Sequence, residues 1–262
     1  MSVDESVHAQ RHGTTLLLTL SNPGKKNAFF PEMRRRLTTL VADALPTDGL
    51  RGILIAGADG HFCAGADVTL IGGTTPQDVI RVRETMKDVH GLLRAITGSP
   101  LPVYAAVEGD AFGAGFSLAA ACDYVIAGRT ARFGAAFSKI GLLPDMGVLW
   151  TLTQRVGAAE AKRLMMLSPS LLAPEVAALG LVDLVVEPGT AVEQGVARLA
   201  DFSKVAPLTT AMVKASFARG LAHLDDAMQA ELDYMPLLVQ SEDHREGLTA
   251  LREKRPAIFK AR

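Results

Sequence analysis

The segment that decides the fold is residues 103–118, VYAAVEGDAFGAGFSL. Residues 102–107 predict an apolar strand, and the small residues 114–122 predict a helix. The loop between them, residues 109–115, consists largely of Gly and Ala, which let a ligand approach the main chain closely. The N–H groups at the start of a helix point outward and carry a partial positive charge. The segment therefore predicts a main-chain site for a negatively charged oxygen.

A second loop of the same character lies earlier in the chain. Residues 61–67, HFCAGAD, come after a short apolar strand predicted over 52–56, of the type that is buried on both faces. Two such loops facing one another can hold an oxyanion between main-chain donors. Gly-rich turns between strands and helices also occur for tight packing alone. Each loop is therefore a weak signal, and the pair is a stronger one.

Strand and helix patterns alternate up to about residue 186, and this alternation predicts an α/β fold. Beyond residue 190 the pattern is only helical. The four helical segments are 190–204, 207–219, 224–240 and 243–254. We therefore expect a core over residues 1–189 and an all-helical C-terminal module over residues 190–262.

Composition and charge exclude several classes of protein. The chain has 262 residues, with 27 Lys and Arg against 28 Asp and Glu, and a net charge of -1. Binding to nucleic acid or to a membrane surface needs a cationic surplus, and no apolar run reaches the ~18 residues of a membrane span. Two cysteines, Cys63 and Cys122, exclude a disulfide scaffold and suit a reducing compartment. With a polar N-terminus that lacks the apolar core of a signal peptide, we expect a cytoplasmic protein.

Three further patterns point to other chemistries but are incomplete. Residues 113–118 begin like a dinucleotide-binding fingerprint, whose sixth position requires Gly or Ala where this chain has Leu118. Ser117 lies in an approximate nucleophile elbow, but the predicted strand ends well before it, which argues against a serine hydrolase. His8 and His12 have the spacing of metal ligands without a supporting carboxylate, so we expect no metal site.

A helix is predicted to begin at Pro31 and carries three consecutive arginines, Arg34, Arg35 and Arg36. Such a run invites a nucleic-acid interpretation. Three charges on one face of an amphipathic helix are more often exposed to water. We therefore expect these three side chains to lie in solvent.

The two loops resemble the signature loops of the crotonase (enoyl-CoA hydratase/isomerase) superfamily. The resemblance is carried by residues 62–67, 107–123, 133–134, 139–145, 177–183 and 252–256, together with Phe259. It implies a spiral of ββα turns and a C-terminal helical module that forms a homotrimer or a homohexamer. It also implies an acyl-CoA thioester as substrate, and no cofactor beyond the coenzyme A moiety of that substrate.

The resemblance also assigns roles to individual residues. The main-chain N–H groups of Ala66 and Ala114 would stabilise the enolate that forms when a thioester loses an α-proton. The residues expected to contact the coenzyme are Lys26, Ala28, Ala64, Gly65, Asp67 and Lys260. For Asp67 a structural role, in which it orients the first loop, is an alternative.

Two positions depart from the pattern of the hydratases in this superfamily. Those enzymes carry two glutamates, because adding water to a double bond needs both a base and an acid. Here the corresponding residues are Ser117 and Phe137. Neither side chain can take a proton at a useful rate. We therefore expect hydratase activity to be weak or absent.

One carboxylate, Asp145, remains at the position where the resemblance to double-bond isomerases places a single acid–base group. Moving a double bond needs only one such group, which returns the proton that it took. The alternative is that Asp145 caps the helix that follows it. We expect an enoyl-CoA isomerase. The alternatives are a hydratase-like protein with weak activity, a ring isomerase of aromatic-catabolism acyl-CoA esters, and a non-catalytic acyl-CoA binder.

Overall fold

The computed structural model describes residues 6–70 and 79–262, and its central element is a six-stranded sheet. In the order β1-β2-β3-β4-β6-β9, the strands are β1 (Val7–His12), β2 (Thr15–Leu20), β3 (Gly52–Gly57), β4 (Val103–Val107), β6 (Tyr124–Gly128) and β9 (Leu184–Val186). Strands β1 and β2 form an antiparallel hairpin, and the other neighbours are parallel. Since parallel strands end at the same edge of a sheet, the loops after β3 and β4 leave side by side.

A second, three-stranded sheet lies beside the two loops. Its strands, in the order β5-β7-β8, are β5 (Asp110–Phe112), β7 (Arg132–Gly134) and β8 (Leu171–Leu172). A single parallel bridge joins Cys63 to Ala111 of β5. This small sheet therefore ties the loop after β3 to the loop after β4.

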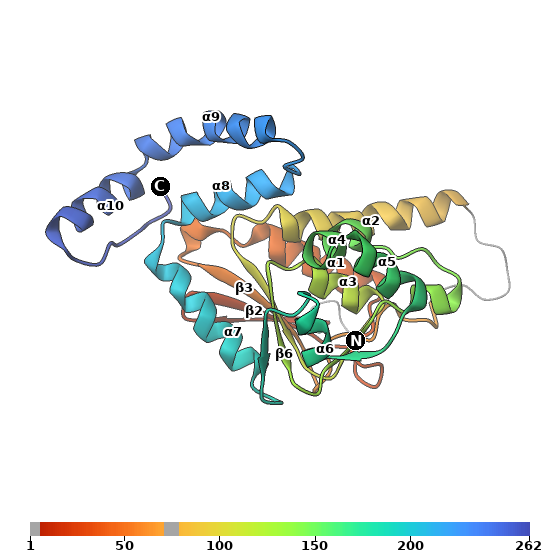
Figure 1. Cartoon of the computed structure of the whole chain (residues 1–262). Coiled ribbons are helices and arrows are strands. Elements are labelled where there is room, and N and C mark those ends of the chain that lie inside the picture. Colours follow the sequence, from red (N-terminus) through yellow and green to blue (C-terminus); the bar gives the residue numbers. More distant parts are fainter. Residues whose placement is uncertain (1–5, 71–78) are drawn as a thin grey trace.

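Helices cover both faces of the six-stranded sheet (Figure 1). They are α1 (Pro31–Asp43), α2 (Val79–Thr97), α3 (Ala114–Ala121), α4 (Val148–Val156), α5 (Ala158–Leu167), α6 (Ala173–Ala178), α7 (Ala191–Leu199), α8 (Pro207–Ala218), α9 (Leu224–Gln240) and α10 (Glu242–Glu253), with the short 3-10 helices η2 (Pro46–Asp48), η3 (Phe137–Ile140) and η4 (Ala200–Lys204). Alternate residues of one strand enter two different cores. Ile53 and Ile55 of β3 pack with α1 to α4, whereas Leu54 packs with α7.

The predicted α/β class is confirmed, and the predicted elements agree with the structure to within a few residues. Strand β1 was not predicted, because most of its side chains are polar or exposed and show no apolar alternation. It contains His8 and His12. Thr75, Pro76 and Asp78 are typical of a helix start, and these three residues lie outside the described part of the chain. Among the described residues, no helix is long and apolar enough to cross a membrane.

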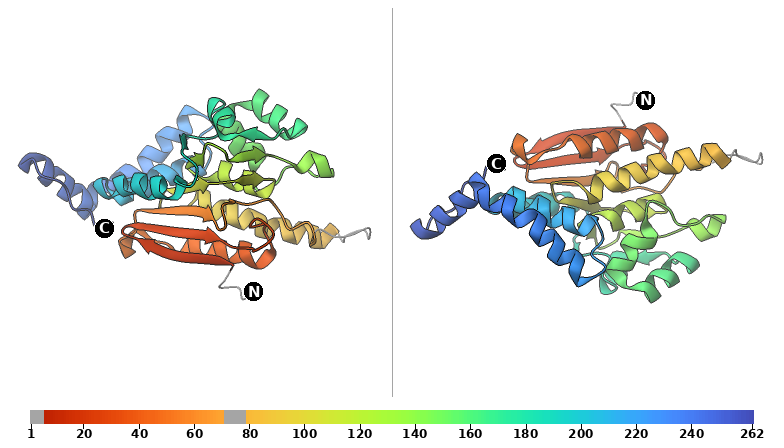
Figure 2. Two further views of the ribbon diagram at one scale, coloured as in Figure 1. Left: turned by 90° about the horizontal axis from the view of Figure 1, so that it is seen from below. Right: turned by 90° about the horizontal axis from the view of Figure 1, so that it is seen from above.

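The C-terminal helices differ in how closely they join the body. Helix α7 packs on the sheet through buried Ala191 and Leu199, and buried Lys214 of α8 pairs with Asp123. Helix α9 lies over α8, on the side away from the sheet (Figure 1), and α10 projects from the body in both views of Figure 2. The predicted boundary between core and C-terminal module, after residue 189, therefore falls between the sheet and α7, although α7 packs on that sheet.

Candidate active site

A turn before α1 holds the loop after β3 in place. The N–H of Ala64 donates to the carbonyl of Lys26 (3.0 Å), and the N–H of Phe29 donates to the carbonyl of Gly65 (2.7 Å). The carbonyl of Phe29 accepts from the N–H of Asp67 (2.8 Å). The structure thus brings together the turn and the loop that the resemblance assigns to coenzyme binding, apart from the C-terminal lysine.

Asn27 fixes this turn from inside the protein. Its side chain is buried, and Nδ2 donates to the carbonyls of Ala58 (2.8 Å) and His61 (2.7 Å). Its Oδ1 accepts from the N–H of Asn22 (3.1 Å). Because all three partners are main-chain groups, Asn27 sets the backbone of the turn relative to the loop after β3. The sequence analysis assigned it no such role.

The loops after β3 and β4 are in direct contact. The N–H of Cys63 donates to the carbonyl of Asp110 (2.9 Å), and the N–H of Phe112 donates back to the carbonyl of Cys63 (3.0 Å). Gly65, at φ +108°, lies so close to the second loop that an added Cβ would be 3.0 Å from Phe112 O and 3.6 Å from Ala114 N. A side chain at this position would therefore obstruct the space between the loops.

The main-chain N–H groups of Ala66 and Ala114 have no acceptor among the described residues. Ala114 is the first residue of α3, so its N–H has no partner within the helix. Ala66 directly follows Gly65, whose Cα faces the start of α3. Two unpaired donors next to one another, one of them at a helix N-terminus, suit a negatively charged oxygen. That they bind a thioester oxygen stays a prediction.

Helix α4, which follows Asp145, packs against α3, which begins at Ala114. Arg155 in the last turn of α4 donates from Nη2 to the carbonyl of Cys122 (2.6 Å) and from Nε to that of Ala120 (3.3 Å), at the C-terminal end of α3. The C-terminal ends of the two helices therefore lie together, and Asp145 stands just before the start of α4.

The Asp145 carboxylate is largely buried and has an unpaired oxygen. Its Oδ1 has no hydrogen-bond partner among the described residues. The residue at the N-cap of α4 is Gly147, and no side chain caps the helix, so the alternative that Asp145 is a helix cap is wrong. Burial raises the pKa of Asp145 above its ordinary value, and the charges of Arg34 and His90 offset part of that rise.

A second carboxylate, Asp110, organises the cations around the loops. It is buried and accepts from Lys26 Nζ (2.8 Å) and from Arg132 Nε (2.9 Å) and Nη2 (2.7 Å). His61 Nδ1 lies 3.5 Å from the same carboxylate. Burial acts to raise the pKa of Asp110, but the hydrogen bonds from Lys26 and Arg132 lower it overall. Asp110 therefore stays ionised and holds Lys26 against the second loop.

Asp67 has a comparable set of partners in the first loop. Its carboxylate accepts from Lys25 Nζ (2.6 Å) and from the N–H (3.0 Å) and hydroxyl (2.6 Å) of Thr69. Hydrogen bonds from Lys25 and Thr69 lower the pKa of Asp67. These contacts orient the first loop, as the structural alternative for Asp67 predicted.

Comparison with known proteins agrees with this geometry. The sequence model of the enoyl-CoA hydratase/isomerase family matches residues 10–262. The chain belongs to this family. It is 36% identical to a "Probable enoyl-CoA hydratase" of Rhodobacter capsulatus, over 94% of each chain, and 32% identical to the 1,2-epoxyphenylacetyl-CoA isomerase of Escherichia coli, over 93% of this chain and 94% of that one. An enoyl-CoA hydratase from a Polaromonas species superposes with a TM-score of 0.90 at 31% identity, covering 97% of this chain and 99% of that one.

The protein is thus an acyl-CoA enzyme of the enoyl-CoA hydratase/isomerase family, and the predicted resemblance is confirmed.

The two positions that the resemblance assigns to hydratase glutamates are closed to water. Ser117 is fully buried in α3, and its hydroxyl has no partner among the described residues. Phe137 is buried in η3, two residues after Ala135, whose carbonyl accepts from the N–H of Phe137 (2.8 Å). Neither residue supplies a carboxylate to this family member.

Within a single chain, Lys260 does not lie near the loop after β3. Arg51, directly before β3, donates from Nη2 to the carbonyl of Phe259 (2.9 Å). The N–H of Lys260 donates to Asp243 Oδ1 (2.6 Å). These bonds hold the C-terminal segment at the start of β3, whereas the loop predicted to contact the coenzyme follows the end of that strand, roughly 20 Å away. Lys260 therefore lies apart from the other predicted coenzyme contacts.

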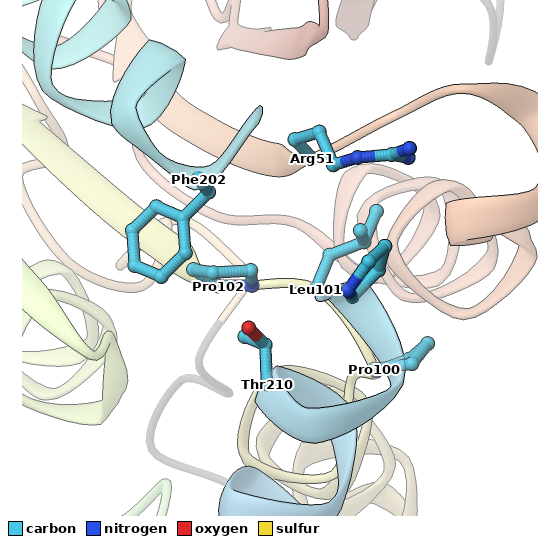
Figure 3. Close-up of a pocket in the computed structure, with 7 residues that line it drawn as sticks. Arg51, Pro100, Leu101, Pro102, Phe202 and Thr210 are labelled. Atoms are coloured by element: carbon cyan, nitrogen blue, oxygen red, sulfur yellow. The ribbon is translucent and has the colours of Figure 1, made fainter. Parts of the chain in front are cut away.

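A small cavity lies beside the same end of β3 (Figure 3). Its volume is about 10 Å³, and Arg51, Pro100, Leu101, Pro102, Phe202, Pro207 and Thr210 line it. A cavity of this size holds about one water molecule. It is too small for an acyl chain and stands at the opposite end of the strand from the loop after β3. No group of three or more potential metal ligands occurs within residues 6–70 and 79–262.

The ion-pair network of Asp110 predicts how stability depends on pH. Its pKa is lower in the folded protein than in the unfolded chain, so its contribution is present above about pH 4 and is lost as the pH falls through the folded-state pKa. In Asp110→Asn we expect a lower free energy of unfolding at pH 7 and a weaker loss of stability below pH 4. Urea unfolding between pH 3 and pH 7 measures both.

Asp43→Asn is the matched control for this prediction, because Asp43 is exposed at the end of α1. It should unfold with the pH dependence of the unmodified protein. If Asp110→Asn did the same, the Asp110 network would contribute nothing to stability and the prediction would be wrong.

Proposed function

We propose that the protein is an enoyl-CoA isomerase, which moves a carbon–carbon double bond through a thioester enolate. The observation that carries this proposal is the largely buried carboxylate of Asp145, whose Oδ1 has no partner among the described residues. Asp145 stands before α4, which packs on α3, the helix whose first residue, Ala114, has a free N–H. A single carboxylate is enough for a 1,3-proton shift and too little for the usual hydration, which needs a base and an acid.

In the proposed reaction the thioester carbonyl oxygen of a 3-enoyl-CoA accepts from the N–H groups of Ala66 and Ala114. Asp145 takes a proton from C2, and the electrons of that C–H bond form the C1–C2 double bond of the enolate while the charge moves to the oxygen. The enolate then re-forms the carbonyl, the double bond moves to C2–C3, and Asp145 returns its proton to C4. The product is the 2-enoyl-CoA, with no net gain or loss of atoms.

The electrostatics of Asp145 favour this role. Desolvation raises its pKa, which makes the carboxylate a stronger base than one in water. The N–H groups stabilise the enolate more than the neutral thioester, because the oxygen is charged only in the enolate. The coenzyme would extend from there along the turn at Lys26 and Ala28 and the loop at Ala64, Gly65 and Asp67.

Two further points belong to this proposal. The similarity to a 1,2-epoxyphenylacetyl-CoA isomerase supports a ring-bearing acyl group as a second candidate substrate.

We also propose that the protein forms a homotrimer or a homohexamer. Helix α9 exposes Leu232, Met235 and Val239 in an apolar groove, and subunit contacts commonly cover such a groove.

A panel of CoA esters tests the proposal. We expect turnover of 3-hexenoyl-CoA to 2-hexenoyl-CoA and hydration of crotonyl-CoA that is at least about 100-fold slower, because Ser117 and Phe137 provide neither acid nor base. Ultraviolet absorbance of the conjugated thioester follows both reactions. Rapid hydration of crotonyl-CoA would contradict the proposal. Tight binding of every ester without any turnover would indicate a non-catalytic acyl-CoA binder instead.

A further inference from the structure

Arg34 in the first part of α1 is largely but not fully buried, although the sequence pattern predicts a solvated face for it. Its side chain is 12% exposed, whereas that of the next residue, Arg35, is 56% exposed. Its Nε is buried and has no hydrogen-bond partner among the described residues. The prediction of three solvated arginines is therefore wrong for Arg34. Helix α2 packs against α1 and covers this side chain, which the sequence of α1 alone does not show.

The surroundings of Arg34 leave this donor unsatisfied. Its closest carboxylate, Asp88 of α2, is half exposed and stands 3.9 Å from Nη2, beyond hydrogen-bond distance. Asp88 also interacts with Arg35 Nη1 at 3.6 Å. Glu32 in the same turn is bonded to Arg35 rather than to Arg34. A buried guanidinium N–H that lacks an acceptor costs free energy, so this position favours a ligand that supplies one.

The segment that carries Asp145 packs on the helix that covers Arg34, because a Cβ added to Gly147, two residues after Asp145, would collide with Leu93 of α2. Asp145 and Arg34 also attract one another electrostatically. No ion pair of 4.0 Å or less joins Arg34 to Asp145 in the described part of the chain, and each retains one buried unpaired atom. An unpaired donor and an unpaired acceptor thus remain in the region where the acyl group of the proposed reaction would lie.

The charges of Arg34, Asp88 and Asp145 determine which polar group of a ligand can bind beside Arg34. A carboxylate on the ligand would meet Arg34, but it would also meet the negative charges of Asp88 and Asp145. An uncharged oxygen accepts a hydrogen bond from Arg34 without that repulsion, and a hydroxyl can also donate to Asp145.

We propose that Arg34 determines substrate specificity by donating a hydrogen bond to an uncharged oxygen, carbonyl or hydroxyl, on the acyl group beyond the carbons that Asp145 serves. The inference rests on the proposed function, because the role of Asp145 defines where the acyl group lies. It adds to that function a substrate class, the oxygenated acyl-CoA esters, and a residue that recognises them.

Calorimetric titration of the full chain with non-reacting esters tests this inference. The probes are hexanoyl-CoA, 4-oxohexanoyl-CoA, 5-oxohexanoyl-CoA, 6-hydroxyhexanoyl-CoA and the dicarboxylic adipoyl-CoA. At pH 8 we expect at least one of the three uncharged oxygenated esters to bind about tenfold more tightly than hexanoyl-CoA, as a hydrogen bond to a charged donor predicts. In Arg34→Met this preference should fall below twofold, while the Kd of hexanoyl-CoA stays unchanged.

Arg35→Met is the matched control, because it removes the neighbouring but exposed guanidinium and should retain the preference. Arg34→Gln provides a second variant if Arg34→Met does not fold. Equal affinities for hexanoyl-CoA and all three uncharged oxygenated esters would overturn the inference, and so would tightest binding of adipoyl-CoA. A preference that survives in Arg34→Met would overturn it as well.

The same variants separate this inference from the proposed function. Removing the charge of Arg34 should raise the pKa of Asp145 and shift the acid limb of the isomerase pH profile upward. If that shift occurred without any oxygen preference, Arg34 would only position Asp145 and the specificity role would be wrong. Oxygen preference without isomerisation of any enoyl-CoA would contradict the proposed function alone.

Discussion

Replacing Asp145 with Asn is expected to lower kcat for isomerisation of 3-hexenoyl-CoA by about 10³-fold, within the range for loss of a general acid–base group. The amide has nearly the shape of the carboxylate but cannot take up the proton from C2. Hexanoyl-CoA should still bind with a Kd within about twofold of the original value, because the main-chain donors and the coenzyme loop are untouched. Steady-state kinetics and calorimetry measure the two quantities.

The stability of this variant gives an independent check. Because burial raises the pKa of Asp145 in the folded state, the ionised group destabilises the fold at neutral pH. Asp145→Asn should therefore unfold at a higher urea concentration at pH 7, although it is nearly inactive. Asp43→Asn, on the exposed end of α1, should change neither property. Activity within tenfold of the original enzyme would place the base at another residue.

Replacing Ala114 with Pro is expected to lower kcat by about 10²- to 10³-fold, since the substitution deletes one of the two proposed oxyanion donors. Proline has no N–H but is well tolerated at the first position of a helix, and Ala114 is the first residue of α3. The substitution thus deletes the N–H and puts the ring Cδ in front of the nitrogen, where the oxygen would bind, without breaking the helix. Single-turnover kinetics with 3-hexenoyl-CoA would measure the loss in the chemical step.

A closely matched control exists elsewhere in the chain. Ala158 is the first residue of α5, is exposed, and follows a glycine at the N-cap, as Ala114 does. Ala158→Pro should keep full activity and a similar melting temperature. If both variants kept full activity, the N–H of Ala114 would have no part in the reaction and the proposed enolate mechanism would lose its main support.

The buried strands could be predicted because their composition alone distinguishes them. Strands β3 and β4 are short apolar runs that begin and end within a residue of the predicted bounds, since each is covered by helices on both faces. Strand β1 is an edge strand with exposed polar side chains, and β5, β7 and β8 contain only two or three residues each. Such strands are too polar or too short to show a period-two pattern.

The candidate site was predictable only in part. The two loops proposed to bind an oxyanion could be found from small residues following buried strands, because that pattern is local. The role of Asp145 came from resemblance, since its burial depends on tertiary packing rather than on a local pattern. The Asp110 network joins Lys26 to Arg132 across more than 100 residues, and the burial of Arg34 depends on α2. No local pattern contains these contacts.

The contact of Arg155 with the end of α3 has an electrical consequence. The last carbonyls of a helix carry a partial negative charge, and its first N–H groups carry a partial positive charge. The guanidinium of Arg155 neutralises the negative end of α3, where it binds the carbonyls of Ala120 and Cys122. No side chain caps the other end, which begins at Ala114, so its positive charge is available to an anion.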